Sequence, residues 1–178
     1  MRKVISIAAL ALMITAPLAG FARTPATSML DAHARAMGNR RALAVSIGER
    51  LFLRTWAAQI LSVRVDGIGR HSVAGLALSG VKFHKPLTKS QFIQEIVAIT
   101  GMSFAATRLE EVDLWCSVPL WVGKGATVSG DLAVPTSRTV FAVTVRREEP
   151  PHSLYARLRA GNDVFWDADW ARKAFRPG

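Results

Sequence analysis

Alternating apolar and polar positions predict four strands along the chain. In residues 59–66, Leu61, Val63 and Val65 fall on one face, and polar side chains separate them. A period of two residues is typical of a strand with one buried face. The other predicted strands are residues 71–84, 111–120 and 138–146, the last with Phe141, Val143 and Val145 inward.

The second of these strands contains a change of pattern. Leucines fall on one face of residues 71–84 before Ser79, whereas Val81 and Phe83 fall on the other face after Gly80. One extra residue opposite the neighbouring strand produces such a change, so we expect a β-bulge there. The short glycine-containing turn before this strand predicts antiparallel pairing with the first strand.

The third strand holds the only cysteine of the chain. Strand parity places Cys116 on the apolar face with Val112, Leu114 and Val118, and places Trp115 on the polar face with Asp113 and Ser117. A free cysteine on an apolar face is usually a small core residue, because a catalytic thiolate needs a nearby cation or helix N-terminus. We therefore expect Cys116 in the core and Trp115 outside it. Pairing should weaken at Pro119, which has no amide hydrogen.

An amphipathic helix follows the second strand. Thr88 is a favourable N-cap, and Gln91 completes a capping box three residues later. Gly101 is expected to end this helix. Its inward face is predicted to consist of Phe92, Ile93, Ile96, Val97 and Thr100. Such a helix should lie across the sheet.

The region before the first strand is predicted to contain short elements. A helix at residues 29–37 is expected to stop at Gly38. Residues 42–47 and 51–56 flank Gly48 and are interpreted as a hairpin. A passage from a helix into a strand is the alternative.

The C-terminal part should contain a short strand at residues 126–130 and a basic helix at residues 153–160, which Gly161 closes. After it come the aromatic residues Phe165, Trp166, Trp170 and Phe175. Because these side chains are large and apolar, we expect the C-terminal segment to dock on the domain.

The order of these elements predicts an α+β fold. Hairpin-like connections favour a two-layer sandwich, in which a mainly antiparallel sheet of about four to six strands carries two main helices on one face. No repeat or linker divides the chain, so residues 23–178 are expected to form a single domain.

The first residues have the layout of a secretory signal peptide. Arg2 and Lys3 precede an apolar run at residues 4–18, and small residues flank Phe21. We expect cleavage after residue 22, which leaves no transmembrane segment and predicts a periplasmic or secreted protein. A membrane anchor is the alternative, but the apolar run is shorter than the roughly 20 residues that span a bilayer.

The chain is basic, with a formal net charge of +10 at pH 7. In an exported protein this charge favours an acidic partner protein or an anionic surface, such as lipid or cell-wall polymer, over nucleic acid. The basic residues are spread along the chain, so solubility explains the charge equally well.

Motifs for several chemistries are missing from the sequence. The four histidines show no HxxxH, HxH or HExxH spacing, and the chain contains no CxxC and no GxSxG. The GKG at residues 123–125 lacks the remainder of a phosphate loop. We therefore predict no catalytic residue, metal or cofactor. A small hydrolase or thiol-dependent enzyme that uses Cys116, Ser129 or His84 is the enzymatic alternative.

Tryptophans are the most suggestive residues, because exposed aromatic side chains are typical anchors of protein interfaces. The candidate interaction residues are Trp115, Trp121, Trp166, Trp170 and Lys124. For Trp115, cover by the C-terminal segment is the favoured expectation, and contact with a partner is the alternative. We expect an exported, non-enzymatic accessory or binding protein with a protein partner in a larger periplasmic assembly. The remaining alternative is a carrier of a small apolar or anionic ligand between sheet and helix.

Overall fold

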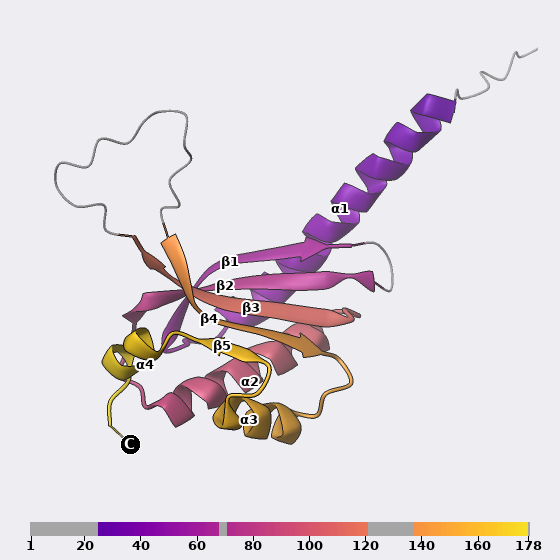
Figure 1. The fold of residues 1–178 in the computed structure, drawn as a ribbon. Coiled ribbons are helices and arrows are strands. Elements are labelled where there is room, and N and C mark those ends of the chain that lie inside the picture. Colours follow the sequence, from indigo (N-terminus) through magenta and orange to yellow (C-terminus); the bar gives the residue numbers. More distant parts are fainter. Residues whose placement is uncertain (1–24, 68–70, 121–136, 178) are drawn as a thin grey trace, which may run out of the picture.

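A computed structural model describes residues 25–67, 71–120 and 137–177, and these contain four helices and a five-stranded sheet (Figure 1). The elements in chain order are α1 (Pro25–Phe52), β1 (Ala58–Asp66), β2 (Val73–Phe83), α2 (Lys89–Ala106), β3 (Glu111–Pro119), β4 (Ser137–Arg146), α3 (Pro151–Ala160), β5 (Val164–Trp166) and α4 (Ala168–Ala174). Within the described residues, no helix combines the length and hydrophobicity that a membrane span requires. The expected signal peptide, residues 1–22, lies outside the described ranges.

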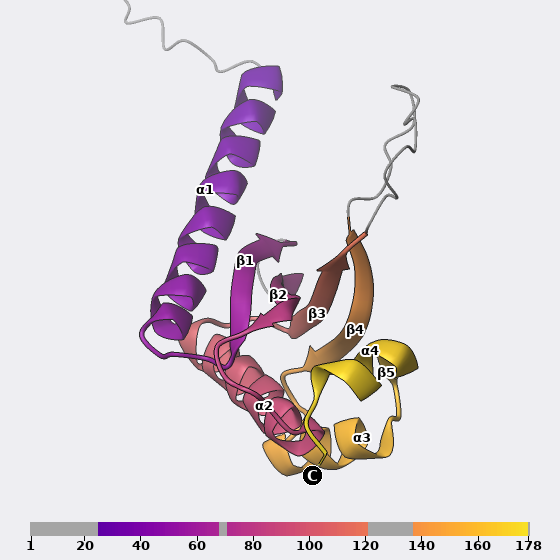
Figure 2. The ribbon, with the colours of Figure 1, turned by 90° about the vertical axis from the view of Figure 1, so that its left-hand side faces the viewer.

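The sheet has the strand order β1-β2-β3-β4-β5. Neighbouring strands pair antiparallel except β2 and β3, which are parallel. A parallel pair needs a long crossover, and α2 supplies it. The helices lie on one side of the sheet (Figure 2), which confirms the predicted α+β fold with a mainly antiparallel sheet.

The core fills the space between the sheet and the helices. Most of the side chains that the sequence placed inward are fully or nearly fully buried, among them Leu76, Leu78, Phe92, Ile93, Ile96, Val112, Leu114, Cys116, Phe141, Val143 and Val145. The capping box at the start of α2 is present: Gln91 N donates to Thr88 Oγ1, and Thr88 N donates to Gln91 Oε1. The capping box and the alternation along the strands therefore predicted correctly which of these side chains form the core.

The bulge expected near Ser79 is present and larger than expected. Ala58 pairs with Phe83 but Ile60 pairs with Leu78, so β2 contains several additional residues between these two pairs. The Ser79 hydroxyl accepts hydrogen bonds from the backbone N–H groups that follow it. A second irregularity in β1 turns Leu61 outward, where it is 51% exposed. The prediction that Leu61 faces the core is therefore wrong.

The predictions for the region before β1 are also wrong. The expected helix at 29–37 and the expected hairpin of 42–47 and 51–56 form one continuous helix, α1, which passes through Gly38 and Gly48. Its C-terminal part buries Ile47 and Leu51 in the core and packs against β1 and α2. Its N-terminal part projects from the body of the molecule (Figures 1 and 2).

The end of α2 also differs from expectation. The helix continues past Gly101 to Ala106. The guanidinium group of Arg147 then donates hydrogen bonds to the backbone carbonyls of Phe104, Thr107 and Leu109. A cation here donates hydrogen bonds to carbonyls that the helix C-terminus leaves without a partner. Its charge also interacts favourably with the negative end of the helix dipole.

The C-terminal segment docks on the domain, as expected. Gly161 closes α3 in the left-handed conformation, with a φ of 79°. β5 then adds an antiparallel strand to β4, and Asp167 caps α4 by accepting a hydrogen bond from Trp170 N. The expected short strand at 126–130 lies outside the described residues.

Candidate functional site

The thiol of Cys116 lies in the core, as strand parity predicted. Cys116 is fully buried in β3, opposite Phe141 of β4. Burial, followed by the negative charge of Glu95, raises the pKa of this thiol far above its ordinary range. A protonated, inaccessible thiol is a poor nucleophile, because the thiolate is the reactive form.

The other residues of the enzymatic alternative are not gathered around the thiol. His84 is exposed, beyond the end of β2, and Ser129 lies outside the described residues. Within the described part of the chain, no group of three or more His, Cys, Asp or Glu side chains is placed to hold a metal ion.

Two of the candidate tryptophans, Trp166 and Trp170, belong to an aromatic cluster on the helical side of the sheet. The ring centroid of Phe92 lies 5.9 Å from that of Trp166 and 6.0 Å from that of Trp170. Trp170 Nε1 donates a 2.7 Å hydrogen bond to the carbonyl oxygen of Gly80. Lys89 Nζ lies 4.5 Å from the ring centroid of Trp166. These contacts hold the C-terminal segment on the domain. Trp170 is buried and Trp166 is half-buried, and an interaction role for either ring stays a prediction.

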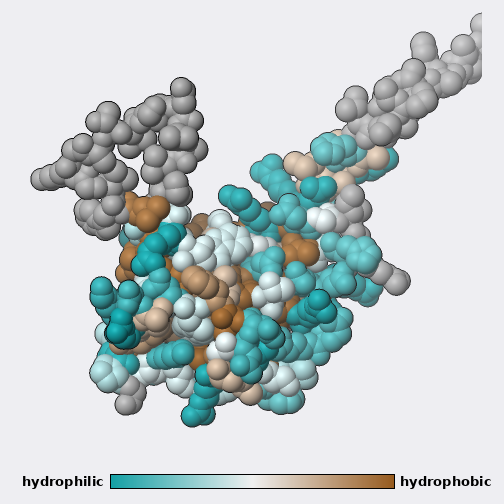
Figure 3. Space-filling view, in the orientation of Figure 1, coloured by the Kyte–Doolittle hydropathy of each residue, from teal (hydrophilic) through white to brown (hydrophobic). Residues whose placement is uncertain are grey.

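Trp115 lies on the opposite face of the sheet, which the helices leave open. Two further candidates, Trp121 and Lys124, lie outside the described residues. The register places Ala77, Trp115, Ala142 and Phe165 in one row across β2, β3, β4 and β5. The space-filling view in Figure 3 shows residues of intermediate and high hydropathy, coloured white and brown, over the middle of the molecule, with hydrophilic residues around and between them.

The position of the Trp115 ring depends on a glycine in the neighbouring strand. A Cβ atom at Gly75 would lie 3.1 Å from the six-membered ring of Trp115, so the ring occupies space that a side chain at Gly75 would need. Trp115 is half-buried, and Phe165, at the other end of the row, is 51% exposed. The C-terminal segment flanks Trp115 through Phe165, while its remaining aromatic rings pack on the other face.

Trp115 and Phe165 line a hollow of about 460 Å³ on this outer face. Two carboxylates, Asp113 and Asp163, also line the hollow, and no Lys or Arg is among its lining residues. Thr144 Oγ1 donates a 2.6 Å hydrogen bond to Asp113 Oδ1. Beside the hollow, the Arg157 guanidinium, which is paired with Glu149, donates hydrogen bonds to the backbone carbonyls of Asp163 and Thr144. The hollow is therefore lined by aromatic rings and two carboxylates, with an ion-paired arginine at its edge.

Sequence patterns located only part of this hollow. Parity placed Trp115 and Asp113 on the outer face, but Phe165 and Asp163 reach it only because β5 returns to pair with β4. β5 has three residues, too few for a period-two pattern to indicate which face each occupies.

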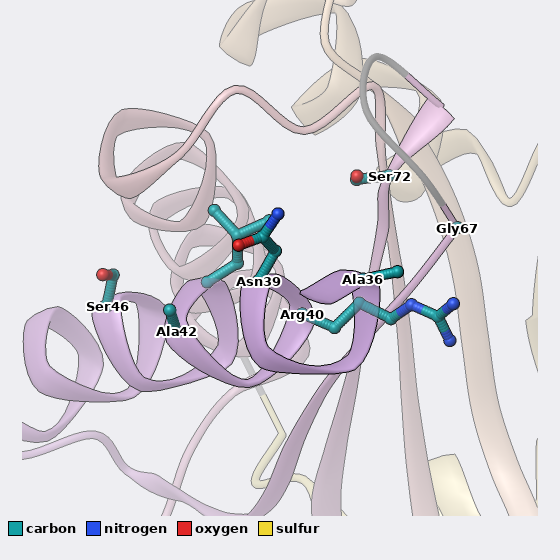
Figure 4. Close-up of a pocket in the computed structure, with 8 residues that line it drawn as sticks. Ala36, Asn39, Arg40, Ala42, Ser46, Gly67 and Ser72 are labelled. Carbon is teal, nitrogen blue, oxygen red and sulfur yellow. The ribbon is translucent and has the colours of Figure 1, made fainter. Parts of the chain in front are cut away.

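A second cavity, of about 380 Å³, lies between α1 and the facing ends of β1 and β2. Figure 4 shows Ala36, Asn39 and Arg40 along α1, with Gly67 and Ser72 across the cavity. Arg40 Nε is buried and has no hydrogen-bond partner among the described residues. The ligand-carrier alternative expected a cavity between sheet and helix that is lined by the inward-facing residues, and the residues that line this cavity are not among those predicted to face inward.

Comparison with known proteins gave no match to a family model, to a curated protein or to a solved structure. The chemistry of the outer face is therefore the basis for a functional proposal.

Proposed function

We propose that this chain is an exported, non-enzymatic binding protein that joins a larger periplasmic assembly by docking a protein partner on the outer face of its sheet. The observation that supports the proposal is the hollow lined by Trp115 and Phe165 on the face that the helices leave open. Partly exposed aromatic side chains on a rigid framework are typical of interface hot spots.

The framework around Trp115 is well suited to this role. β3 lies in the middle of the sheet, paired with β2 on one side and β4 on the other. The ring is already packed above Gly75. A side chain that is ordered before binding loses less conformational entropy when a partner arrives, so more of the contact energy contributes to affinity.

The charge of the hollow indicates the chemistry of the partner. Asp113 and Asp163 attract a cation, and a cationic group over an aromatic ring contributes about 0.5–2 kcal/mol, depending on how far it is desolvated. An anionic lipid or cell-wall polymer would meet two carboxylates here. We infer that the partner protein inserts a Lys or Arg side chain between Trp115 and Phe165.

In-cell photo-crosslinking tests the docking face. We expect p-benzoylphenylalanine in place of Phe165 to form an adduct with one protein in the producing cells. The same group in place of Val81 is the matched control, because Phe165 is 51% and Val81 is 56% exposed. An absence of adducts at residue 165, or equal labelling from both positions, would contradict the proposal.

Binding measurements with the crosslinked partner test the chemistry. Asp113→Asn keeps an acceptor for Thr144 but removes the charge, and Trp115→Leu removes the aromatic face. We expect each to weaken binding by about tenfold, as should removal of the inserted Lys or Arg from the partner. Unchanged affinity in Asp113→Asn and Trp115→Leu, with unchanged circular dichroism, would exclude this hollow as the docking site.

Export is tested separately, because it rests on the sequence of the first residues. We expect the protein to fractionate outside the cytoplasm and its mature N-terminus to be Arg23. A cytoplasmic protein that retains residue 1 would contradict export while leaving the binding face to be judged by crosslinking.

A further inference from the structure

An apolar groove of about 550 Å³ runs between α1 and β1, away from the hollow around Trp115. The exposed large apolar side chains of the described residues are Met37, Val45, Phe52, Leu53, Leu61, Val81, Leu120 and Phe165. The first five of them belong to α1, to the turn after it or to β1. Such a concentration on one side of a molecule is typical of an interaction surface.

β1 also has a free edge on this side. Among the residues that the structure describes, it is the terminal strand of the sheet and pairs with β2 alone. Proteins commonly protect an edge strand of this length with charges, bulges or a covering element. The irregularities in β1 interrupt its ladder, but they also turn Leu61 outward into the groove.

Two residues of α1 that line the groove are equally distant from Val45 and opposite in charge. Arg41 lies four residues before Val45 and Glu49 lies four residues after it, and both line the groove. At a rise of 1.5 Å per residue, each is about 6 Å from Val45 along the helix axis. In the part of the chain that the structure describes, neither Arg41 nor Glu49 forms an ion pair.

Residues equally distant from Val45 also include Ala42 and Gly48, which are both small. Gly48 lines the groove, whereas Ala42 lines the separate cavity beside α1. Gly38 and Phe52 form the next such pair, in which a residue without a side chain corresponds to a large ring. Nothing lies within 4 Å of the position of a Cβ atom at Gly38, which leaves room for a ring from a neighbouring molecule.

We propose that the groove is filled by a second copy of this chain, in a two-fold symmetric dimer whose α1 helices cross antiparallel at Val45. In that arrangement Arg41 of each copy faces Glu49 of the other copy, and Phe52 of each copy faces Gly38 of the other copy. A two-fold interface uses the same patch on both copies. The patch must therefore be complementary to a copy of itself that is rotated by 180°. Arg41 and Glu49 give the groove this complementarity in charge, and most of its other lining residues are apolar.

Sedimentation velocity of the protein as isolated from producing cells tests the dimer. We expect twice the mass of one chain over most of a range from about 1 to 100 µM. Val45→Glu places two like charges at the crossing point and should give monomers throughout this range. Val81→Glu is the matched control, since Val45 is 51% and Val81 is 56% exposed, and it should remain dimeric.

Circular dichroism and thermal melting establish that each variant is folded. Monomers of the unmodified protein at the highest concentration would overturn the proposal, because the groove would then be open or would serve a different partner. A dimer that survives in folded Val45→Glu would overturn it as well.

A charge exchange tests the antiparallel register. We expect Arg41→Glu and Glu49→Arg each to weaken dimerisation by about tenfold, because each creates two repulsive contacts per dimer. The double variant, which carries both exchanges, should restore an affinity within about threefold of the original. If the double variant is as weak as the single ones, Arg41 does not meet Glu49 and the proposed arrangement is wrong.

Discussion

Among single residues, Cys116 has the environment that most directly separates a binding protein from a thiol-dependent enzyme. Its burial raises the pKa of the thiol, and the Glu95 carboxylate acts in the same direction. We expect Ellman's reagent to leave Cys116 unlabelled in the folded protein at mildly alkaline pH and to label it fully in concentrated guanidinium chloride. Cys116→Ala, unlabelled in both, is the control. Rapid labelling of the folded protein would restore the thiol-enzyme alternative.

Asp167 is a second residue with an environment that changes its titration. The hydrogen bond from Trp170 N, and then the hydrogen bond and charge of Arg138, lower the pKa of this carboxyl group. Because the pKa is lower in the folded chain, the carboxylate stabilises the fold above its unfolded pKa of about 3.9, and this contribution is lost as the pH falls through the folded value.

Asp167→Asn keeps a capping oxygen but has no charge. We expect the variant to be less stable than the original protein at neutral pH, with the difference shrinking as the pH falls below about 4. Urea denaturation followed by tryptophan fluorescence at several pH values measures this difference. A difference that does not depend on pH would show that the charge of Asp167 does not stabilise the fold.

At the scale of the element, the bulge in β2 supports the C-terminal segment. Trp170 Nε1 donates to the Gly80 carbonyl, and a Cβ atom at Gly80 would lie 2.8 Å from Val118 Cγ1 and 2.9 Å from Val140 Cγ2. We therefore expect Gly80→Ala to lower the free energy of unfolding by about 1–3 kcal/mol through overpacking.

Gly101→Ala is the matched control for this substitution. Nothing lies within 4 Å of a Cβ atom at Gly101, which lies inside α2, so the change should raise stability by up to about 1 kcal/mol. Urea denaturation measures both variants. Equal losses of stability at Gly80 and Gly101 would show that crowding at the bulge is not the cause.

Glycines also explain why sequence patterns located some elements and missed others. Gly38 and Gly101 were expected to end helices, because glycine commonly terminates a helix in the left-handed conformation. Gly161 has that conformation, whereas both of these glycines lie within helices. The decisive stabilisation of α1 comes from burial of Ile47 and Leu51 against distant residues, which a local pattern does not contain.

Sequence patterns likewise predicted only part of the candidate site. Alternation within β3 was enough to place Cys116 inside and Trp115 outside, because parity is a local property of a strand. The inward position of Trp166 and Trp170 depends instead on contacts with Phe92 and Gly80, far away in the sequence. Aromatic composition alone therefore could not distinguish core tryptophans from surface ones.

At the scale of the whole molecule, α1 divides into a packed part and a projecting part. Ile47 and Leu51 are fully buried, whereas residues 32–35 are exposed. A helical segment with no tertiary contacts is only marginally stable in water, so its amide hydrogens should exchange quickly with solvent. In a monomer, we expect fast exchange before residue 36 and slow exchange around Ile47 and Leu51.

The proposed dimer changes this profile in a way that depends on concentration. Crossing at Val45 covers α1 from about Gly38 to Phe52, so exchange over that range should slow as the protein concentration rises. Val45→Glu should keep the monomer profile at every concentration. Hydrogen exchange followed by mass spectrometry at two concentrations measures both proteins. Equal protection of residues 38–52 in Val45→Glu and in the concentrated unmodified protein would mean that α1 is stabilised within one chain, whereas protection that appears only in the concentrated unmodified protein requires a second copy.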